Sequence, residues 1–487
     1  MPMEYLGWLF LGILLGGVIS YLITAKRLSS AVSLPSESGT RTPAASLLRT
    51  HFQPISIDNI TVSERSFPFR MRADLQRTID KLFGEDIKVH HVSGVRSECS
   101  HGTPTLSDCM FESAGNPTFS IPPEYEELDI GEGEPLRVLK VGLWLLESNG
   151  VKFVVMLAPT GSYGEITGMQ FQVGTPNSPE GTQITQRFFK SLEDAITKGE
   201  SYRGKILSLE KTDHSYSGES SGVCVHKLHA VAREQVILPS ETLALLERNV
   251  INFAKNRDRL SSLGMSKKKG LLFYGPPGTG KTHTIHHLAN SLPEHTTLLI
   301  AAEQVALLSE YMTLARLLQP SIVVMEDVDL IARERSSMDS PCEEVLLNKL
   351  LNEMDGLKED AAVLFILTTN RPETLEAALA SRPGRVDQAI EFPLPDEVGR
   401  RKLVSLYSPK MQFDESLVTE IVKRTEGVSA SFLKELMRRS AQYAVERSTD
   451  DSLQREDIDQ ALDEMLFKGG ALNRKLLGAS EQATCTA

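Results

Sequence analysis

One eight-residue segment constrains the fold of this chain more than any other feature. It runs from Gly275 to Thr282, follows the apolar run Leu271–Tyr274 and precedes a helical pattern that ends before Pro293. Glycines let successive backbone N–H groups turn toward an anion, and the helix N-terminus adds the positive end of its dipole. In this strand, loop and helix setting, the segment predicts a phosphate-binding loop rather than a mere Gly-rich turn.

The residues of this loop have different predicted roles in binding a nucleotide. We expect Lys281 to reach the β- and γ-phosphates and the Thr282 hydroxyl to ligate Mg²⁺. The other members are expected to surround the phosphates: Gly275, Pro276, Pro277, Gly278, Thr279 and Gly280.

The N-terminus carries the second strong pattern, an uncharged run from Tyr5 to Ala25. At about 1.5 Å per residue, a helix of this length spans the roughly 30 Å hydrocarbon core of a bilayer. A cleaved signal peptide has a basic start and a shorter apolar stretch, so we interpret residues 1–28 as a retained transmembrane anchor. Lys26 and Arg27 follow the span, which predicts a cytoplasmic or organellar-matrix location for the rest of the chain. Because no Arg-rich transit segment is evident, a bacterial inner membrane is favoured over an organellar one.

Composition agrees with a multidomain protein that has few covalent constraints. The chain has 487 residues, more than one ordinary domain, and its net charge of -12 disfavours nucleic acid as the main partner. Five cysteines indicate free thiols in a reducing compartment. One cluster contains imidazoles and thiols, but its spacing fits no closed zinc site, and we interpret its members as ordinary residues: His90, His91, Cys99, His101 and Cys109.

Changes of pattern predict the domains that precede the loop. Residues 29–48 are rich in Ser, Thr and Pro and are typical of a flexible linker. Residues 49–235 are interpreted as an α+β domain that contacts a client or partner. Its expected elements are a β-hairpin from Val138–Leu146 and Val151–Leu157 around Ser148-Asn149-Gly150, a helix at Gln186–Thr197 and a strand at Lys205–Leu209.

The remainder of the chain has the pattern of a nucleotide-binding α/β unit followed by helices. Residues 236–397 contain short apolar runs typical of a parallel sheet that helices cover on both faces, and residues 398–468 have helical spacing. Residues 469–487 are polar and predicted to be disordered. The strands expected after the loop are Thr297–Ile300, Ile322–Met325 and Ala362–Thr368.

Polar side chains follow two of these strands, at the end of a parallel sheet where chemistry is usually located. Glu326 and Asp327 follow one strand, and Asn370 follows another. A hydrolase of phosphoanhydrides needs one carboxylate for hydrated Mg²⁺ and another group that orients the attacking water. The sequence therefore predicts a hydrolytic site beside the phosphate loop.

Four motifs together resemble the AAA ATPase family in their order and spacing, over roughly residues 236–468. They are the phosphate loop, the acidic pair, Asn370-Arg371-Pro372, and Ser381-Arg382-Pro383-Gly384-Arg385-Val386-Asp387. The resemblance implies a P-loop AAA+ core with a parallel sheet and a C-terminal helical lid.

The resemblance also implies a role for each motif in the hydrolysis of ATP. Glu326 would hold the hydrated Mg²⁺, Asp327 would orient the water, and Asn370 would sense the γ-phosphate. Arg382 and Arg385 would be arginine fingers that act in the site of a neighbouring subunit, so the chain would form a hexameric or similar ring.

The sequence departs from the family pattern in three places. The acidic pair is Glu-Asp instead of Asp-Glu, as in the mitochondrial inner-membrane AAA translocase that exports the folded Rieske protein; Asp327 is shorter than a glutamate, so either the backbone compensates or hydrolysis is slow. The stretch Ala301–Gln319 is short, with Tyr311-Met312 as the only nearby candidate for a pore loop. No His-Glu-x-x-His motif of the membrane AAA proteases is present.

These features predict a membrane-anchored, Mg²⁺-dependent AAA ATPase that remodels or translocates a protein client. The alternative is a nucleotide-gated membrane scaffold with little or no turnover, which the inverted acidic pair favours. A DNA-acting protein of the same family fits poorly with the anchor and the acidic charge balance.

Overall fold

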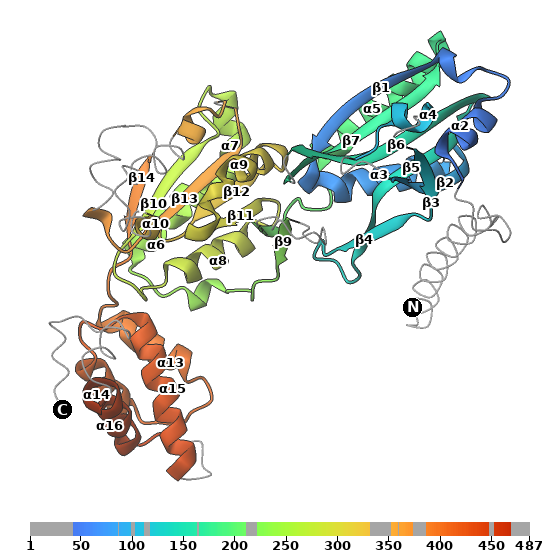
Figure 1. Ribbon diagram of the computed structural model, residues 1–487. Helices are drawn as coiled ribbons and strands as arrows, with labels where there is room; N and C mark the ends of the chain where they lie inside the picture. The colour runs from blue at the N-terminus through green and yellow to red at the C-terminus, as the bar shows by residue number, and fades with distance from the viewer. Residues whose placement is uncertain are drawn as a thin grey trace, which may run out of the picture. The chain divides into compact units, whose positions relative to one another are not determined.

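The computed structural model describes residues 42–85, 87–98, 103–111, 117–162, 165–210, 222–331, 352–358, 360–373, 386–447 and 452–468. The predicted anchor, Tyr5–Ala25, and the tail 469–487 lie outside these residues. The described residues form two compact units, one within Met1–Ser201 and Thr212–Val223 and the other within Tyr202–Lys211 and Cys224–Ala487 (Figure 1). Within the described ranges, no helix has the length and apolar character that a membrane span requires.

The first unit is an antiparallel sheet in the order β1-β7-β6-β5-β2-β3, with β4 also paired to β5. Helices cover both of its faces, since the consecutive residues 142–146 of the central strand β5 are all buried. Its strands are β1 (Ile60–Pro68), β2 (Lys88–Ser97), β3 (Thr118–Ile121), β4 (Glu124–Leu128), β5 (Leu136–Ser148), β6 (Val151–Ser162) and β7 (Glu165–Pro176). Its helices are α2 (Ala44–Phe52), η1 (Ile57–Asn59), η2 (Phe69–Met71), α3 (Arg72–Glu85), α4 (Leu106–Met110) and α5 (Pro179–Lys198).

Alternation along β5 separates two hydrophobic layers. Leu143 and Leu145 pack in a cluster with residues of α2 and α4. Trp144 lies on the opposite face, where its ring meets Phe83 of α3 in an edge contact and Phe83 stacks on Phe188 of α5. Side chains of a strand alternate between faces, so these contacts place the two helix pairs on opposite sides of the sheet.

The predicted hairpin and helix of this unit are confirmed. Strands β5 and β6 pair from Gly142 to Ser148, and the turn residues Asn149 and Gly150 both have positive φ, at 50° and 80°. Such a turn matches the twist of the strands it joins. Helix α5 starts earlier than predicted because the Ser178 side chain accepts a hydrogen bond from the Gly181 N–H, which caps the helix before its apolar spacing begins.

The second unit contains a sheet in the order β14-β10-β13-β12-β11-β8-β9, and its pairs from β14 to β8 are parallel. The four predicted apolar runs all form strands of this sheet, and helix α8 ends before Pro293 as expected. The strands are β8 (Ile206–Leu209), β9 (Val223–His226), β10 (Lys269–Tyr274), β11 (Thr296–Ile300), β12 (Ser321–Met325), β13 (Val363–Thr369) and β14 (Gln388–Glu391). The helices are η3 (Arg233–Gln235), α6 (Ser240–Leu246), the π-helix η4 (Glu247–Asn252), α7 (Phe253–Ser262), α8 (Lys281–Ser291), η5 (Ala302–Leu307), α9 (Leu308–Leu317) and α10 (Val328–Ile331).

One strand belongs to a different unit from the one the sequence indicated. Lys205–Leu209 is a strand as predicted, but β8 pairs with β11 of the second sheet, with Ile206 opposite Thr297. Residues 202–211 therefore lie in the unit of the phosphate loop, inside the range 49–235 that we assigned to the α+β domain. Parallel partners lie far apart in sequence, so local patterning does not reveal this pairing.

The predicted helical lid after Asp396 forms a bundle of helices with its own core. Helix α13 begins where the Asp396 side chain accepts a hydrogen bond from the Gly399 N–H. The helices of this bundle are α13 (Glu397–Tyr407), α14 (Glu415–Arg424), α15 (Ala430–Arg447), α16 (Arg455–Asp463) and the π-helix η6 (Glu464–Lys468), packed around a single cluster of apolar side chains.

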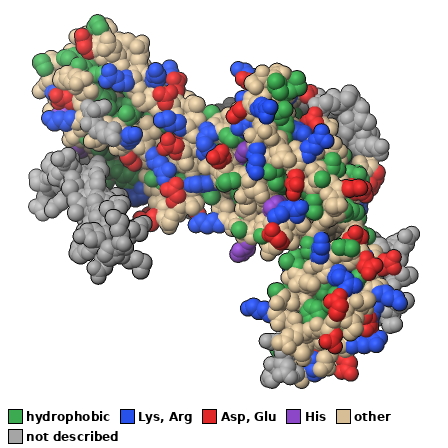
Figure 2. All heavy atoms as spheres, turned by 180° about the vertical axis from the view of Figure 1, so that it is seen from behind, with side chains coloured by type: hydrophobic (Ala, Val, Ile, Leu, Met, Phe, Trp, Pro, Cys, Tyr) green, Lys and Arg blue, Asp and Glu red, His purple; other side chains and the backbone are tan. Residues whose placement is uncertain are grey.

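On the described part of the face in Figure 2, Lys and Arg side chains are interspersed with Asp and Glu, unlike the continuous basic face typical of nucleic-acid binding.

Candidate functional site

The phosphate loop joins β10 to α8, and its glycines are required by backbone geometry. Gly275, Gly278 and Gly280 have φ of 144°, 75° and 100°, which side chains of L-residues rarely tolerate. A Cβ on Gly275 would lie 2.2 Å from the Phe392 carbonyl oxygen, and one on Gly278 would lie 1.9 Å from the Ser431 hydroxyl. The predicted loop is therefore packed between Phe392, the residue after β14, and the start of α15 in the lid.

Lys281 is buried, and its ammonium group bonds to both the loop and the neighbouring strand. Its Nζ donates to the carbonyl oxygens of Gly275 at 2.8 Å and Pro276 at 3.0 Å, and to Asn370 Oδ1 at 2.8 Å. Burial lowers the Lys281 pKa to about 8, and the nearby carboxylates of Asp327 and Asp329 oppose this shift. A desolvated cation beside a glycine-rich loop is suited to phosphate.

Thr282 and Glu326 are the two predicted Mg²⁺ ligands, and they are in contact. Thr282 Oγ1 donates to Glu326 Oε1 at 2.7 Å. Hydroxyl and carboxylate oxygens are the hard donors that Mg²⁺ prefers, so this pair fits the ion. Bound there, Mg²⁺ would neutralise charge on the phosphate oxygens.

Asn370 connects the lysine to the second acidic residue. Its Nδ2 donates to Asp327 Oδ1 at 3.0 Å while its Oδ1 accepts from Lys281. Burial raises the pKa of Asp327, and the carboxylates of Asp329 and Glu326 raise it further. The predicted sensor, water-orienting group and phosphate-binding lysine thus form one hydrogen-bonded chain.

The backbone at Asp327 is left-handed, with φ of 47°. Such a conformation costs a residue with a side chain about 1 to 3 kcal/mol unless its surroundings hold it. Here the Asp327 N–H donates to Thr368 Oγ1 at 2.9 Å. This left-handed backbone is relevant to the first of the two alternatives that the sequence left open, compensation by the backbone or slow hydrolysis.

Three contributors to the site were not found from the sequence. Asp329 is 6% exposed and accepts hydrogen bonds from Thr369 Oγ1 at 2.9 Å and from the Asn370 N–H at 3.2 Å, which fixes the end of β13. Thr368 holds Asp327, as described above. At the lid, the Ser431 N–H donates to the Gly278 carbonyl oxygen at 3.1 Å. Two of them had a sequence signal: Asp329 lies in the acidic run after β12, and Ser431 lies in the segment Gly427–Ser431 that precedes a helical run.

The remaining predicted residues fall into two groups. Arg382 and Arg385 lie outside the described residues, so the arginine-finger assignment stays a prediction. The pore-loop candidate Tyr311-Met312 is wrong, because both side chains are fully buried in α9 and Tyr311 donates to Gln304 Oε1. The burial of an aromatic residue on a short helix depends on the sheet beneath it, which the local sequence does not specify.

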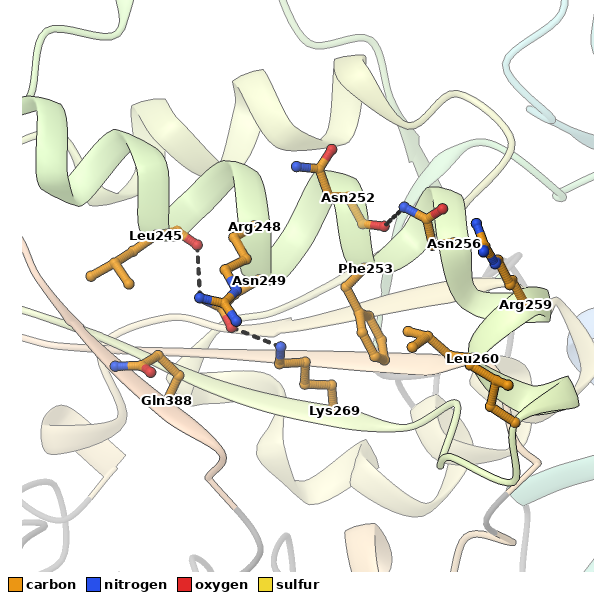
Figure 3. A pocket seen from close by; sticks show the side chains of 11 residues that line it. Leu245, Arg248, Asn249, Asn252, Phe253, Asn256, Arg259, Leu260, Lys269 and Gln388 are labelled. Carbon is orange, nitrogen blue, oxygen red and sulfur yellow. Dashed lines mark hydrogen bonds between the residues drawn. The ribbon is translucent and has the colours of Figure 1, made fainter.

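A separate cavity of about 700 Å³ lies between the α6–α7 stretch and the sheet edge formed by β10 and β14 (Figure 3). Its lining includes the cations Arg248, Arg259 and Lys269 and contains no residue of the phosphate loop. Lys269 lies over the ring of Phe253 and donates to Asn249 Oδ1 at 2.8 Å. The cavity is therefore distinct from the nucleotide site.

Comparison with known proteins finds one matching family model and several similar proteins. Residues 271–394 match the model of the family described as ATPase family associated with various cellular activities (AAA). The ATP-dependent zinc metalloprotease FtsH 2 of Symbiobacterium thermophilum is 31% identical over 48% of this chain and 42% of its own length. The proteasome-activating nucleotidase of Methanocaldococcus jannaschii is 30% identical over 57% of this chain and 63% of its own. A 26S proteasome regulatory subunit 6B homolog of Encephalitozoon cuniculi is 34% identical over 44% of this chain and 58% of its own. The chain thus spans less than two thirds of each of these relatives.

Proposed function

We propose that this chain, which carries an AAA ATPase domain at residues 271–394, hydrolyses ATP with Mg²⁺ to remodel or translocate a protein client. The observation that carries the proposal is the chain of hydrogen bonds from Lys281 through Asn370 to Asp327, beside the contact of Thr282 with Glu326. It joins a group for the phosphates, a group for the attacking water and a pair for the metal ion at the ends of adjacent parallel strands.

The residues have separate roles in the proposed reaction. The loop and Lys281 hold the triphosphate, and Asn370 aligns the lysine with Asp327. Asp327 accepts a hydrogen bond from the attacking water and orients it, which is positioning rather than covalent catalysis. The raised pKa of Asp327 makes its carboxylate a better proton acceptor than an exposed aspartate.

We further propose that the active form is a ring in which Arg382 and Arg385 reach the site of the next subunit. An arginine finger supplied in trans is worth about 10³ to 10⁵ in rate, so a single copy would turn over slowly. The names of the relatives, a protease and two proteasome-associated proteins, support a protein as the client. The first unit, which lies outside the matched family region, is the proposed contact surface for that client.

Membrane anchorage through Tyr5–Ala25 is also part of the proposal, in a bacterial or organellar inner membrane and with the bulk of the chain on the cytoplasmic or matrix side. The Glu326-Asp327 order is similar to that of the Rieske-protein translocase, which also carries one N-terminal anchor, and this likeness supports the proposed anchorage. Flotation with vesicles should retain the full chain and lose a variant without residues 1–28. Equal flotation of both would exclude the anchor.

A phosphate-release assay tests the enzymatic part. Specific activity should rise with protein concentration as rings form, and Lys281→Ala should abolish ATP binding while Lys255→Ala, at an exposed position of α7, should not. Binding of ATP without measurable phosphate release at any concentration would favour the nucleotide-gated scaffold instead. A separate experiment identifies the client: an Asp327→Asn variant is crosslinked in the presence of ATP, and the proteins bound to it are identified.

A further inference from the structure

We propose that Thr368 is a positioning residue for hydrolysis, because its hydroxyl holds the backbone of Asp327 in the left-handed conformation that brings this short carboxylate to Asn370. The inference rests on the proposed function of the site. It assigns a reason to the Glu-Asp order of this chain, and it concerns a threonine that none of the sequence motifs includes.

The position of Thr368 follows from the register of the sheet. Strands β12 and β13 pair in parallel up to Met325 and Leu367, so the ladder ends one residue before Glu326. The Glu326 N–H turns to the other neighbouring strand and donates to the Ile300 carbonyl oxygen at 3.1 Å. The Asp327 N–H turns back toward β13, where the Thr368 hydroxyl, which is 2% exposed, accepts it at 2.9 Å.

The backbone conformation at Asp327 is unusual in this molecule. Among the described residues, only Asn149 and Asp327 have positive φ without being glycine, and Asn149 lies in a hairpin turn that requires it. Asp and Asn tolerate this region better than residues with longer side chains. A glutamate at position 327 would therefore be disfavoured by the same backbone that the Thr368 hydroxyl stabilises.

This conformation determines which groups the carboxylate meets. Asp327 Oδ1 accepts from Asn370 Nδ2 at 3.0 Å, and Asn370 Oδ1 accepts from Lys281 at 2.8 Å. With an extended or helical backbone, the Cβ of residue 327 would point in a different direction and the contact with Asn370 would be lost. The backbone thus replaces the reach that a longer side chain would supply.

The test compares Thr368→Val, which keeps the shape but removes the acceptor, with Thr368→Ser, which keeps the hydroxyl. We expect Thr368→Val to lower kcat by about 10 to 100-fold, the loss that follows from a small misplacement of a catalytic group, with KM and the Kd for ATP within about twofold. Thr368→Ser should restore kcat to near the wild-type value. Equal kcat for the valine variant and the wild type would overturn the inference.

A second measurement is independent of turnover. A crystal structure of Thr368→Val should show negative φ at Asp327 and loss of the contact with Asn370, whereas an unchanged left-handed Asp327 would overturn the inference. If the wild type itself releases no phosphate, the proposed function fails, and the structure of the variant still decides whether Thr368 holds Asp327. Thr368→Ala serves in both experiments if the valine variant does not fold.

Discussion

Asn370 connects the phosphate-binding lysine to the second acidic residue, because its amide oxygen accepts from Lys281 and its amide nitrogen donates to Asp327. Its backbone N–H is itself held by the buried Asp329. These partners fix which end of the amide faces Lys281 and which end faces Asp327. This geometry suits the proposed role of Asn370 as a sensor of the terminal phosphate, because one amide contacts both the lysine and the carboxylate.

The first prediction concerns removal of this amide. Asn370→Ala should lower kcat by about 10²-fold or more, the usual effect of deleting one hydrogen-bond donor from a catalytic site, while the Kd for ATP changes only severalfold. Phosphate release and equilibrium nucleotide binding measure the two quantities. Asn256→Ala, on the exposed face of α7, is the matched control and should change neither. Turnover of Asn370→Ala within about threefold of the wild type would contradict the role of the bridge.

At this scale the sequence predicted the participants but not their contacts. Lys281, Thr282, Glu326, Asp327 and Asn370 were all identified from motifs, and the structure brings them together. Thr368 escaped notice because its function requires the end of β12 to lie beside β13 and the backbone of Asp327 to be left-handed. Both are tertiary facts that no local pattern encodes.

At the scale of elements, the start of helix α15 links the lid to the phosphate loop. Ser429 is fully buried and its Oγ accepts from the Phe432 N–H at 3.2 Å, which caps the helix. In the same first turn, the Ser431 N–H donates to the Gly278 carbonyl oxygen. The capped start of α15 is thus hydrogen-bonded to the phosphate loop.

Loss of this cap gives the second prediction. Ser429→Ala should lower the free energy of unfolding of the second unit by about 1 kcal/mol, because the N-terminal N–H groups of α15 lose their acceptor. Ser429→Gly should lose only a few tenths of that value, since glycine is tolerated at helix N-caps. Urea unfolding of both variants measures the difference. A more stable alanine variant than glycine variant would show that Ser429 does not act as a cap.

The loop between α8 and β11 contains a histidine whose burial affects stability. Burial and the nearby Arg257 lower the His295 pKa to about 4 from its ordinary value of 6.5. Between these values the unfolded chain binds a proton that the folded chain does not, so this histidine makes folding less favourable as pH falls from 6.5 toward 4. Above 6.5 both states are neutral at this position and the effect disappears.

The third prediction follows from that sign. His295→Gln should reduce the acid sensitivity of unfolding, by on the order of 1 kcal/mol at pH 5 after allowance for solvent screening of this half-buried group. The comparison is the difference in unfolding midpoint between the wild type and the variant at pH 7.5 and at pH 5. His229→Gln is the control, because that side chain is exposed. Parallel pH profiles for wild type and His295→Gln would contradict the assignment.

Elements with strong periodicity were predictable, and those defined by distant partners were not. The buried strands β10 to β13 are uniform apolar runs, and the lid helices repeat apolar residues at helical spacing. Strand β14 has only Ile390 fully buried, which gives little local signal. Strand β8 was recognised as a strand, yet its partner β11 lies some ninety residues later, so it was assigned to the wrong domain.

At the scale of the whole molecule, the proposed ring divides each catalytic site between two copies of the chain. One copy would contribute Lys281 and the acidic pair, and the next would contribute Arg385. A variant of Lys281 and a variant of Arg385, each inactive alone, therefore affect opposite sides of one seam, the interface between two neighbouring copies. In a mixed ring, an intact loop from one variant can face an intact arginine from the other, which a single-copy enzyme does not permit.

The fourth prediction uses this asymmetry. Lys281→Ala and Arg385→Ala should each abolish turnover alone, the first by loss of ATP binding and the second with binding retained. Mixed in equal amounts, they should regain activity, because about a quarter of randomly formed seams combine an intact loop with an intact finger. The control mixes Arg385→Ala with the double variant Lys281→Ala/Arg385→Ala, which leaves no seam complete. If both mixtures stay inactive while the proteins form rings that exchange subunits, the arginine does not act across the seam, and hydrolysis belongs to each copy alone.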